Sequence, residues 1–197
     1  MKDSFDSRMV VYGLLFYGLV LGVCLVAAWL WPEAAGLPWG DPSHAVRDVA
    51  LGLATGGTVI AVSWAMVRWL PSGRRLADLL ARTLKGMPRW AGLPLAVAAG
   101  VAEEAAFRGC AWSALQAWLG TAAAWVLTSV VFGLAHGMFQ RGMRTWSAFA
   151  LATGFALGGL RLWTGSILAA IVAHVLVDAV NLPLVRRAGA ARSPEDE

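Results

Sequence analysis

The sequence predicts an all-α protein: a polytopic membrane helix bundle of about six transmembrane helices, with a further amphipathic helix at the membrane surface. Apolar side chains make up 58% of the 197 residues and charged side chains only 14%, against about 25% in soluble domains. The mean hydropathy is +0.63, and the apolar residues come in runs of about twenty, the length with which a helix crosses a hydrocarbon core of about 30 Å. These observations exclude a soluble, disordered or disulfide-stapled protein.

Six apolar segments approach this length, and only helices or closed barrels satisfy their backbone hydrogen-bonding groups inside a bilayer. The first segment is too long for the core of a signal peptide, and Asp3 and Asp6 interrupt the basic leader of such a peptide, so we expect a retained helix. The expected spans cover residues 10–31, 49–70, 93–119, 121–138, 146–162 and 166–185. Residues 10–185 are thus expected to form a single helical domain.

The basic residues predict the orientation of this bundle. Most of the 16 Lys and Arg residues lie on the side of the amino terminus, whereas the opposite loops hold three acidic residues and only Arg47 and Arg161. Because basic loops stay in the cytoplasm, we expect residues 1–9 and the tail 186–197 to be cytoplasmic and the membrane to be a prokaryotic plasma membrane. Basic residues scattered between apolar runs do not indicate nucleic-acid binding.

Between the second and third spans, apolar residues at helical spacing face away from basic residues. The apolar face consists of Leu76, Leu79, Leu80, Leu84 and Met87, and the basic face of Arg74, Arg75, Arg82, Lys85 and Arg89. This pattern is typical of a helix that lies on an anionic leaflet of the lipid bilayer. A basic loop that only sets the topology explains it equally well.

Ionisable side chains within the expected spans are few, and they come from three distant stretches of sequence. Such groups are costly at bilayer depth, so they tend to face a polar cavity and to carry function. They are Glu103, Glu104 and Arg108 in the third span, His136 in the fourth, and His174 and Asp178, followed by Asn181, in the sixth. Their similar depth predicts one cavity in the inner half of the bilayer.

Helical spacing assigns these groups to faces. Glu104 and Arg108 are four residues apart and share a face, which permits an ion pair, whereas Glu103 is rotated by about 100° from its neighbour. The two carboxylates are therefore expected to have different roles. In the sixth span, His174 heads a polar stripe that continues at helical spacing and must face the bundle interior.

The set is suited to peptide hydrolysis without a covalent intermediate. Glu103 can accept a proton from a water molecule that His136 also binds, and can later pass this proton to the leaving amine. Candidate donors to the developing oxyanion are His174, Asn181 or a protonated Asp178. The sequence has no HExxH motif of a metalloprotease, and we expect no cofactor. Zinc is the alternative, because Glu103, His136, His174 and Asp178 suit it in type and number.

Three motifs occur in the order and helical setting of a known family. They are Glu103-Glu104-Ala-Ala-Phe-Arg108 for EExxxR, Phe132-Gly-Leu-Ala-His136 for FxxxH and His174-Val-Leu-Val-Asp178 for HxxxN/D. From the third span through the sixth, the sequence resembles the CPBP family, which includes CAAX prenyl endopeptidases and the bacteriocin-processing and abortive-infection membrane proteins. The first two spans resemble that family only in being membrane helices.

The resemblance implies a glutamic-type intramembrane endopeptidase. In such an enzyme Glu103 would be the base that activates water and His136 its partner. Glu104 and Arg108 would form a structural ion pair, and Phe132 would pack beside the site.

The resemblance places His174 and Asp178 on the oxyanion side. The CAAX-cleaving branch has Asn where this sequence has Asp178, and an ionised carboxylate would repel an oxyanion. Three alternatives follow: Asp178 is protonated, it orients His174, or Asn181 donates instead.

The implied partner is a membrane-anchored protein substrate, for which a carboxy-terminal sorting or anchor segment is one candidate feature. Prenylated and unprenylated substrates both stay open. The alternative function is that of a noncatalytic membrane binding protein, an immunity or maturation factor that kept the scaffold and grips a partner's transmembrane segment.

Overall fold

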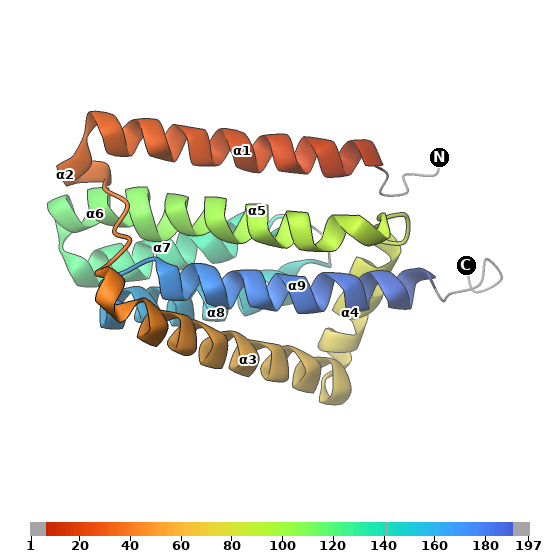
Figure 1. The fold of residues 1–197 in the computed structure, drawn as a ribbon. Helices are drawn as coiled ribbons and strands as arrows, with labels where there is room; N and C mark the ends of the chain where they lie inside the picture. Colours follow the sequence, from red (N-terminus) through yellow and green to blue (C-terminus); the bar gives the residue numbers. More distant parts are fainter. Residues whose placement is uncertain (1–6, 141, 191–197) are drawn as a thin grey trace.

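The computed structural model describes residues 7–140 and 142–190, which form helices and no β-strand (Figure 1). The all-α class is therefore confirmed for this part of the chain. The α-helices are α1 (Ser7–Leu30), α2 (Pro32–Ala35), α3 (Ala45–Trp69), α4 (Pro71–Thr83), α5 (Gly92–Glu104), α6 (Trp112–Leu119), α7 (Thr121–Ala135), α8 (Arg144–Thr164) and α9 (Leu168–Ala190).

Among the described residues, three helical segments are long and apolar enough to cross a membrane. They are α1, the stretch Pro42–Trp69 that contains α3, and Leu168–Ala188 of α9. These segments correspond to the expected spans 10–31, 49–70 and 166–185. The chain is therefore an integral membrane protein built from helices.

The other three expected spans also correspond to helices, but these do not meet the same criterion of length and hydropathy. The expected span 93–119 consists of α5, a π-helix at Ala105–Ala111 and α6. The expected span 146–162 lies within α8, and the expected span 121–138 corresponds to the shorter apolar helix α7. The count of six spans thus stays a prediction.

The end of α7 differs from the expected boundary at residue 138. The helix ends at Ala135, and His136 is its C-cap residue, with φ at −86°. Gly137 follows with φ at +95°, a conformation that glycine adopts at no steric cost and other residues rarely adopt. His136 therefore lies at the junction between α7 and the turn that follows it, and its side chain is not part of a regular helical face.

The central helix of the bundle is α9, which packs against α3, α4, α5 and α8 (Figure 1). Glycines on α3 permit the closest of these approaches. A Cβ atom on Gly52 would lie 2.6 Å from the carbonyl oxygen of Ala169, and one on Gly56 would lie 3.0 Å from that of Ala173. Small residues at such crossings bring two backbones together where no hydrophobic effect drives helices to associate.

The helix α4 lies across one end of the bundle (Figure 1). A helix, and not only a basic loop, therefore follows the second expected span. Its apolar residues Leu76 and Ala81 are 8% and 1% exposed, because this face packs against α9 and α3. Arg74 and Arg75 remain exposed.

The first turn of α1 and the last turn of α9 lie at the end of the bundle that α4 covers (Figure 1). The predictions for residues 1–6 and 191–197, which belong to the expected cytoplasmic ends, fall outside the described residues. The predictions for residues 7–9 and 186–190 fall within α1 and α9, respectively.

Candidate active site

A cavity of about 410 Å³ lies where α1, α5, α7, α8 and α9 meet, and we refer to it as the Glu103 cavity. The expected site residues that line it are Glu103, Phe132, His136, His174, Asp178 and Asn181. Glu104 and Arg108 are fully buried beside them. The structure thus brings the three sequence motifs to one place.

Glu104 is the centre of a buried polar network. Its Oε1 atom accepts a hydrogen bond of 3.0 Å from Nη1 of Arg108 and one of 2.8 Å from Nδ1 of His174. The side chains of Glu104 and Arg108 are both 0% exposed. Burying a charge is tolerable only when it is paired and hydrogen-bonded, and the pairing that the four-residue spacing predicts is present.

Arg108 is held from two further directions. Its Nη2 atom donates a hydrogen bond of 2.9 Å to the carbonyl oxygen of Gly154 on α8. Its guanidinium carbon lies 4.4 Å from the centre of the Phe132 ring on α7, a cation–π distance. Arg108 thereby connects the π-helix to α7 and α8, and a π-helical turn of this kind is frequent at functional sites.

Glu103 lies on the cavity wall, on a different side from Glu104. Its Oε2 atom is 3.6 Å from Nε2 of His136, and the two side chains are 16% and 19% exposed. This separation is too long for a direct hydrogen bond, and Oε2 of Glu103 has no hydrogen-bond partner among the described residues. A separation of this size allows one water molecule to bind both atoms.

The ring of His136 is oriented by its own helix end. Its Nδ1 atom lies 2.6 Å from the carbonyl oxygen of Phe132, so Nδ1–H is the donor of this hydrogen bond. In the neutral ring the other nitrogen, Nε2, is then an acceptor. The centres of the His136 and Phe132 rings are 4.4 Å apart, and this contact aims Nε2 toward Glu103.

His174 lies between two carboxylates. Its Nδ1 atom bonds to Glu104, as described above, and its Nε2 atom is 3.6 Å from Oδ2 of Asp178. The side chain of His174 is 9% exposed and that of Asp178 is 23% exposed. Each ring nitrogen therefore has a carboxylate oxygen as its neighbour.

The amide of Asn181 faces α3. Its Oδ1 atom accepts a hydrogen bond of 3.3 Å from Nε1 of Trp64, and its Nδ2 atom donates one of 3.4 Å to Oγ of Ser63. Asn181 still lines the Glu103 cavity. The polar residues of α9 therefore have partners on two neighbouring helices: His174 bonds to Glu104 on α5, and Asn181 bonds to Trp64 and Ser63 on α3.

Tyr17 is a site residue that the sequence reasoning missed. It lines the Glu103 cavity from α1, opposite Glu103 on α5 and Asp178 on α9. The chain has only two tyrosines, Tyr12 and Tyr17, and both lie in the first apolar run. A polar hydroxyl group within an apolar run indicates a candidate site residue, but the sequence does not show which helix that hydroxyl faces.

The zinc alternative has no matching cluster in the described residues. No group of three or more His, Cys, Asp or Glu side chains there is arranged to hold a metal ion. One ring nitrogen of His174 is already bonded to Glu104, which leaves it one nitrogen for any other ligand. The described residues therefore offer no complete set of metal ligands at this site.

Three sequence motifs thus converge on one cavity of a helical membrane bundle. Residues 85–180 match the family model described as type II CAAX prenyl endopeptidase Rce1-like, a family of proteases. This match supports the assignment of the chain to the CPBP family. The matched range contains all three motifs, from Glu103 to Asp178, and leaves out Tyr17. No curated protein and no solved structure matches the chain.

Proposed function

We propose that this protein is a glutamic-type intramembrane endopeptidase that hydrolyses a peptide bond of a membrane-associated protein. The observation that carries the proposal is the placement of Oε2 of Glu103 and Nε2 of His136, 3.6 Å apart on the cavity wall and not hydrogen-bonded to one another. Two acceptors in this arrangement suit one water molecule between them. The match to a protease family supports the same function.

In the proposed reaction, the water oxygen bonds to the carbonyl carbon of the scissile peptide while Glu103 accepts the proton that it loses. The carbonyl oxygen then carries the negative charge. When the C–N bond breaks, the leaving nitrogen takes the proton from Glu103, and the carbonyl re-forms as a carboxylic acid. One water is consumed, no bond to the enzyme forms, and Glu103 returns to its starting state.

His174 is the oxyanion donor that fits the geometry best. Its Nδ1–H bonds to Glu104, so a ring that also carries a proton on Nε2 can donate to the oxyanion from that atom. Asp178 lies 3.6 Å from Nε2 and is proposed to orient the ring. The amide of Asn181 is engaged by α3, which favours the orienting role of Asp178 over donation by Asn181.

Tyr17 is proposed as a positioning residue for Glu103. Tyr17 lines the same cavity as Glu103, and its hydroxyl is proposed to hold one carboxylate oxygen while the other faces His136. A base held in one rotamer is aligned with the water before the substrate arrives, and such alignment lowers the barrier of the reaction.

The proposed membrane arrangement has six spans, with residues 1–9 and the tail 186–197 in the cytoplasm. The distribution of basic residues supports this orientation, and the neighbouring ends of α1 and α9 agree with termini on one side (Figure 1). Fusions of alkaline phosphatase test it: a fusion after Gly40 should be active outside, and a fusion after Gly142 should be inactive. The opposite pattern would overturn the orientation.

The proposed substrate is a membrane-anchored protein with a carboxy-terminal sorting or anchor segment, and the plasma membrane is the proposed location. The test compares the carboxy-terminal peptides of membrane proteins from cells that express the wild type, Glu103→Gln or Glu33→Gln. Glu33 is an exposed carboxylate outside the site and serves as the matched control. Correct insertion of each variant is checked by its thermal unfolding in detergent.

A new carboxy terminus that appears with the wild type and Glu33→Gln, and is reduced by at least about 100-fold with Glu103→Gln, would support the proposal, since general bases contribute about 10² to 10⁴ in rate. Cleavage that persists in Glu103→Gln would remove Glu103 from the mechanism. If no variant cleaves any protein, including a farnesylated CAAX peptide offered to the purified protein, the noncatalytic binding protein is favoured.

A further inference from the structure

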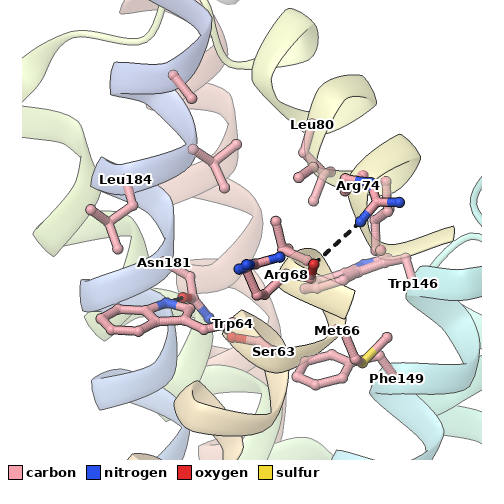
Figure 2. Close-up of a pocket in the computed structure, with 16 residues that line it drawn as sticks. Ser63, Trp64, Met66, Arg68, Arg74, Leu80, Trp146, Phe149, Asn181 and Leu184 are labelled. Atoms are coloured by element: carbon pink, nitrogen blue, oxygen red, sulfur yellow. Dashed lines mark hydrogen bonds between the residues drawn. The ribbon is translucent and has the colours of Figure 1, made fainter. Parts of the chain in front are cut away.

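A second cavity, of about 610 Å³, lies where α3, α4, α8 and α9 meet, and we refer to it as the arginine cavity (Figure 2). It is separate from the family motifs, which lie on other parts of the helices. It shares wall residues with the Glu103 cavity, among them Trp146, Phe149 and Asn181. Anything bound in the arginine cavity therefore touches the wall of the candidate active site.

The walls of the arginine cavity are mostly apolar, and its rim belongs to the outer surface of the bundle. Trp64, Val67 and Leu184 line the cavity and are 53%, 40% and 41% exposed. In a membrane protein, exposed apolar side chains of this kind face acyl chains. The cavity is thus open to the hydrocarbon of the bilayer.

Two arginines lie within this apolar lining, Arg68 in the last turn of α3 and Arg74 in the first turns of α4 (Figure 2). Nη1 of Arg74 donates a hydrogen bond of 3.2 Å to the carbonyl oxygen of Arg68. Two cationic side chains in the lining of one apolar cavity suit an anion with an apolar body.

The elbow between α3 and α4 holds the two arginines close together. Pro71 begins α4, and a Cβ atom on Gly73 would collide with the carbonyl oxygen of Met66. Only glycine therefore lets the first turn of α4 approach the last turn of α3 this closely. This close approach of the two helix ends places the Arg74 guanidinium at the backbone of Arg68.

We propose that the arginine cavity binds an anionic phospholipid of the inner leaflet, with its phosphate between Arg68 and Arg74 and one acyl chain along the apolar walls. The proposal rests on the membrane arrangement proposed above, which places this end of the bundle at the inner leaflet. The charge of the two guanidinium groups matches a phosphate, and the apolar walls of the cavity match an acyl chain.

The wall chemistry favours a lipid over a peptide as the occupant. A peptide in an apolar cavity needs partners for its backbone amides, and the polar side chains of Ser63 and Asn181 in this lining already bond to one another. An acyl chain needs no such partners. Because Asn181 and Trp146 also border the Glu103 cavity, a bound lipid would form part of the surface that a substrate meets.

The experiment measures lipid binding without reference to catalysis. Purified protein in neutral detergent is titrated with phosphatidylglycerol or phosphatidylcholine, and bound lipid is counted by native mass spectrometry while thermal unfolding is followed in parallel. The variants are the wild type, Arg68→Gln/Arg74→Gln, and the matched control Arg75→Gln/Arg82→Gln. The control removes the same charge from exposed residues of α4 that do not line the cavity.

We expect phosphatidylglycerol to bind the wild type and the control at least about 10-fold more tightly than it binds Arg68→Gln/Arg74→Gln, which is the effect of about 1.4 kcal/mol. If phosphatidylglycerol binding were weakened equally in both double variants, the lipid would be attracted to any basic surface, and the proposed binding site would be wrong. Undiminished binding by Arg68→Gln/Arg74→Gln would lead to the same conclusion.

Two further arms identify the occupant. Ala77→Trp fills the cavity and keeps both arginines, so it should lose phosphatidylglycerol while its unfolding temperature without lipid stays near that of the wild type. Free glycerol phosphate should compete only weakly, because it has no acyl chain. If an apolar peptide with a free carboxylate binds in an Arg68-dependent manner and phosphatidylglycerol does not, the lipid proposal is wrong.

Discussion

Nδ1 of His174 lies 2.8 Å from Oε1 of Glu104, the same oxygen that accepts a hydrogen bond from Arg108. The buried ion pair of the first motif and the histidine of the third are therefore one network, attached to different helices. A change at Glu104 should disturb the helix packing and the orientation of His174 together, although Glu104 itself does not line the Glu103 cavity.

The ion pair gives a prediction about stability. Glu104→Leu leaves the guanidinium of Arg108 buried without its carboxylate, and breaking a buried pair in this way costs about 3 to 5 kcal/mol. The double variant Glu104→Leu/Arg108→Leu buries no charge, so it should be less destabilised than the single variant. Reversible unfolding of the purified variants measures both, and a double variant as unstable as the sum of its single changes would contradict the prediction.

Tyr17 gives a prediction about rate. Tyr17→Phe removes the hydroxyl that is proposed to hold Glu103 and keeps the ring, so kcat should fall by about 10-fold, the effect of roughly 1.4 kcal/mol, with KM and the unfolding temperature unchanged. Tyr12→Phe, which removes a hydroxyl from a residue that is 67% exposed on the same helix, should leave kcat unaltered. A rise in KM alone would assign Tyr17 to substrate binding.

The crossing of α3 and α9 gives a prediction about packing. A Cβ atom on Gly52 would lie 2.6 Å from the backbone of α9, whereas one on Gly57 would meet nothing within 4 Å. Gly52→Ala should therefore destabilise the bundle by about 1 to 3 kcal/mol through overpacking, and Gly57→Ala should be neutral or stabilise it by up to about 1 kcal/mol. The comparison uses thermal unfolding, and equal effects at the two positions would refute the close crossing.

Chelation gives a prediction about metal. The proposed reaction uses only Glu103, His136 and His174, so 1,10-phenanthroline should leave the turnover of purified enzyme unchanged. The control is the same chelator with excess zinc, which should also have no effect. Inhibition by the chelator with recovery on addition of zinc would overturn the metal-free mechanism and restore the zinc alternative.

Much of the candidate site followed from spacing along single helices. The four-residue interval between Glu104 and Arg108 predicted their ion pair, which the structure contains, and the rotation of Glu103 away from its neighbour predicted that the two carboxylates would face different groups. These are local properties of a helix with 3.6 residues per turn. They do not depend on which other helices lie nearby.

Two of the differences depend on neighbouring helices. Asn181 belongs by spacing to the stripe of His174, yet its amide bonds to Ser63 and Trp64 on α3. Tyr17 was overlooked because nothing in the first apolar run indicates that it lines the same cavity as Glu103. The third difference is local: His136 was expected inside a helix that extends to residue 138, but the helix ends at Ala135 and Gly137 has a positive φ.

The sequence by itself determined that the chain is a helical membrane protein, which ionisable residues lie in apolar segments, and which of them share a helical face, since hydropathy and helical period are read along one segment at a time. Only the tertiary structure decided that His174 bonds to Glu104, that Tyr17 on α1 lines the same cavity as Glu103, and that Arg68 and Arg74 border another cavity. The first two relationships join residues far apart in the chain, and all three arise from the packing of helices against one another.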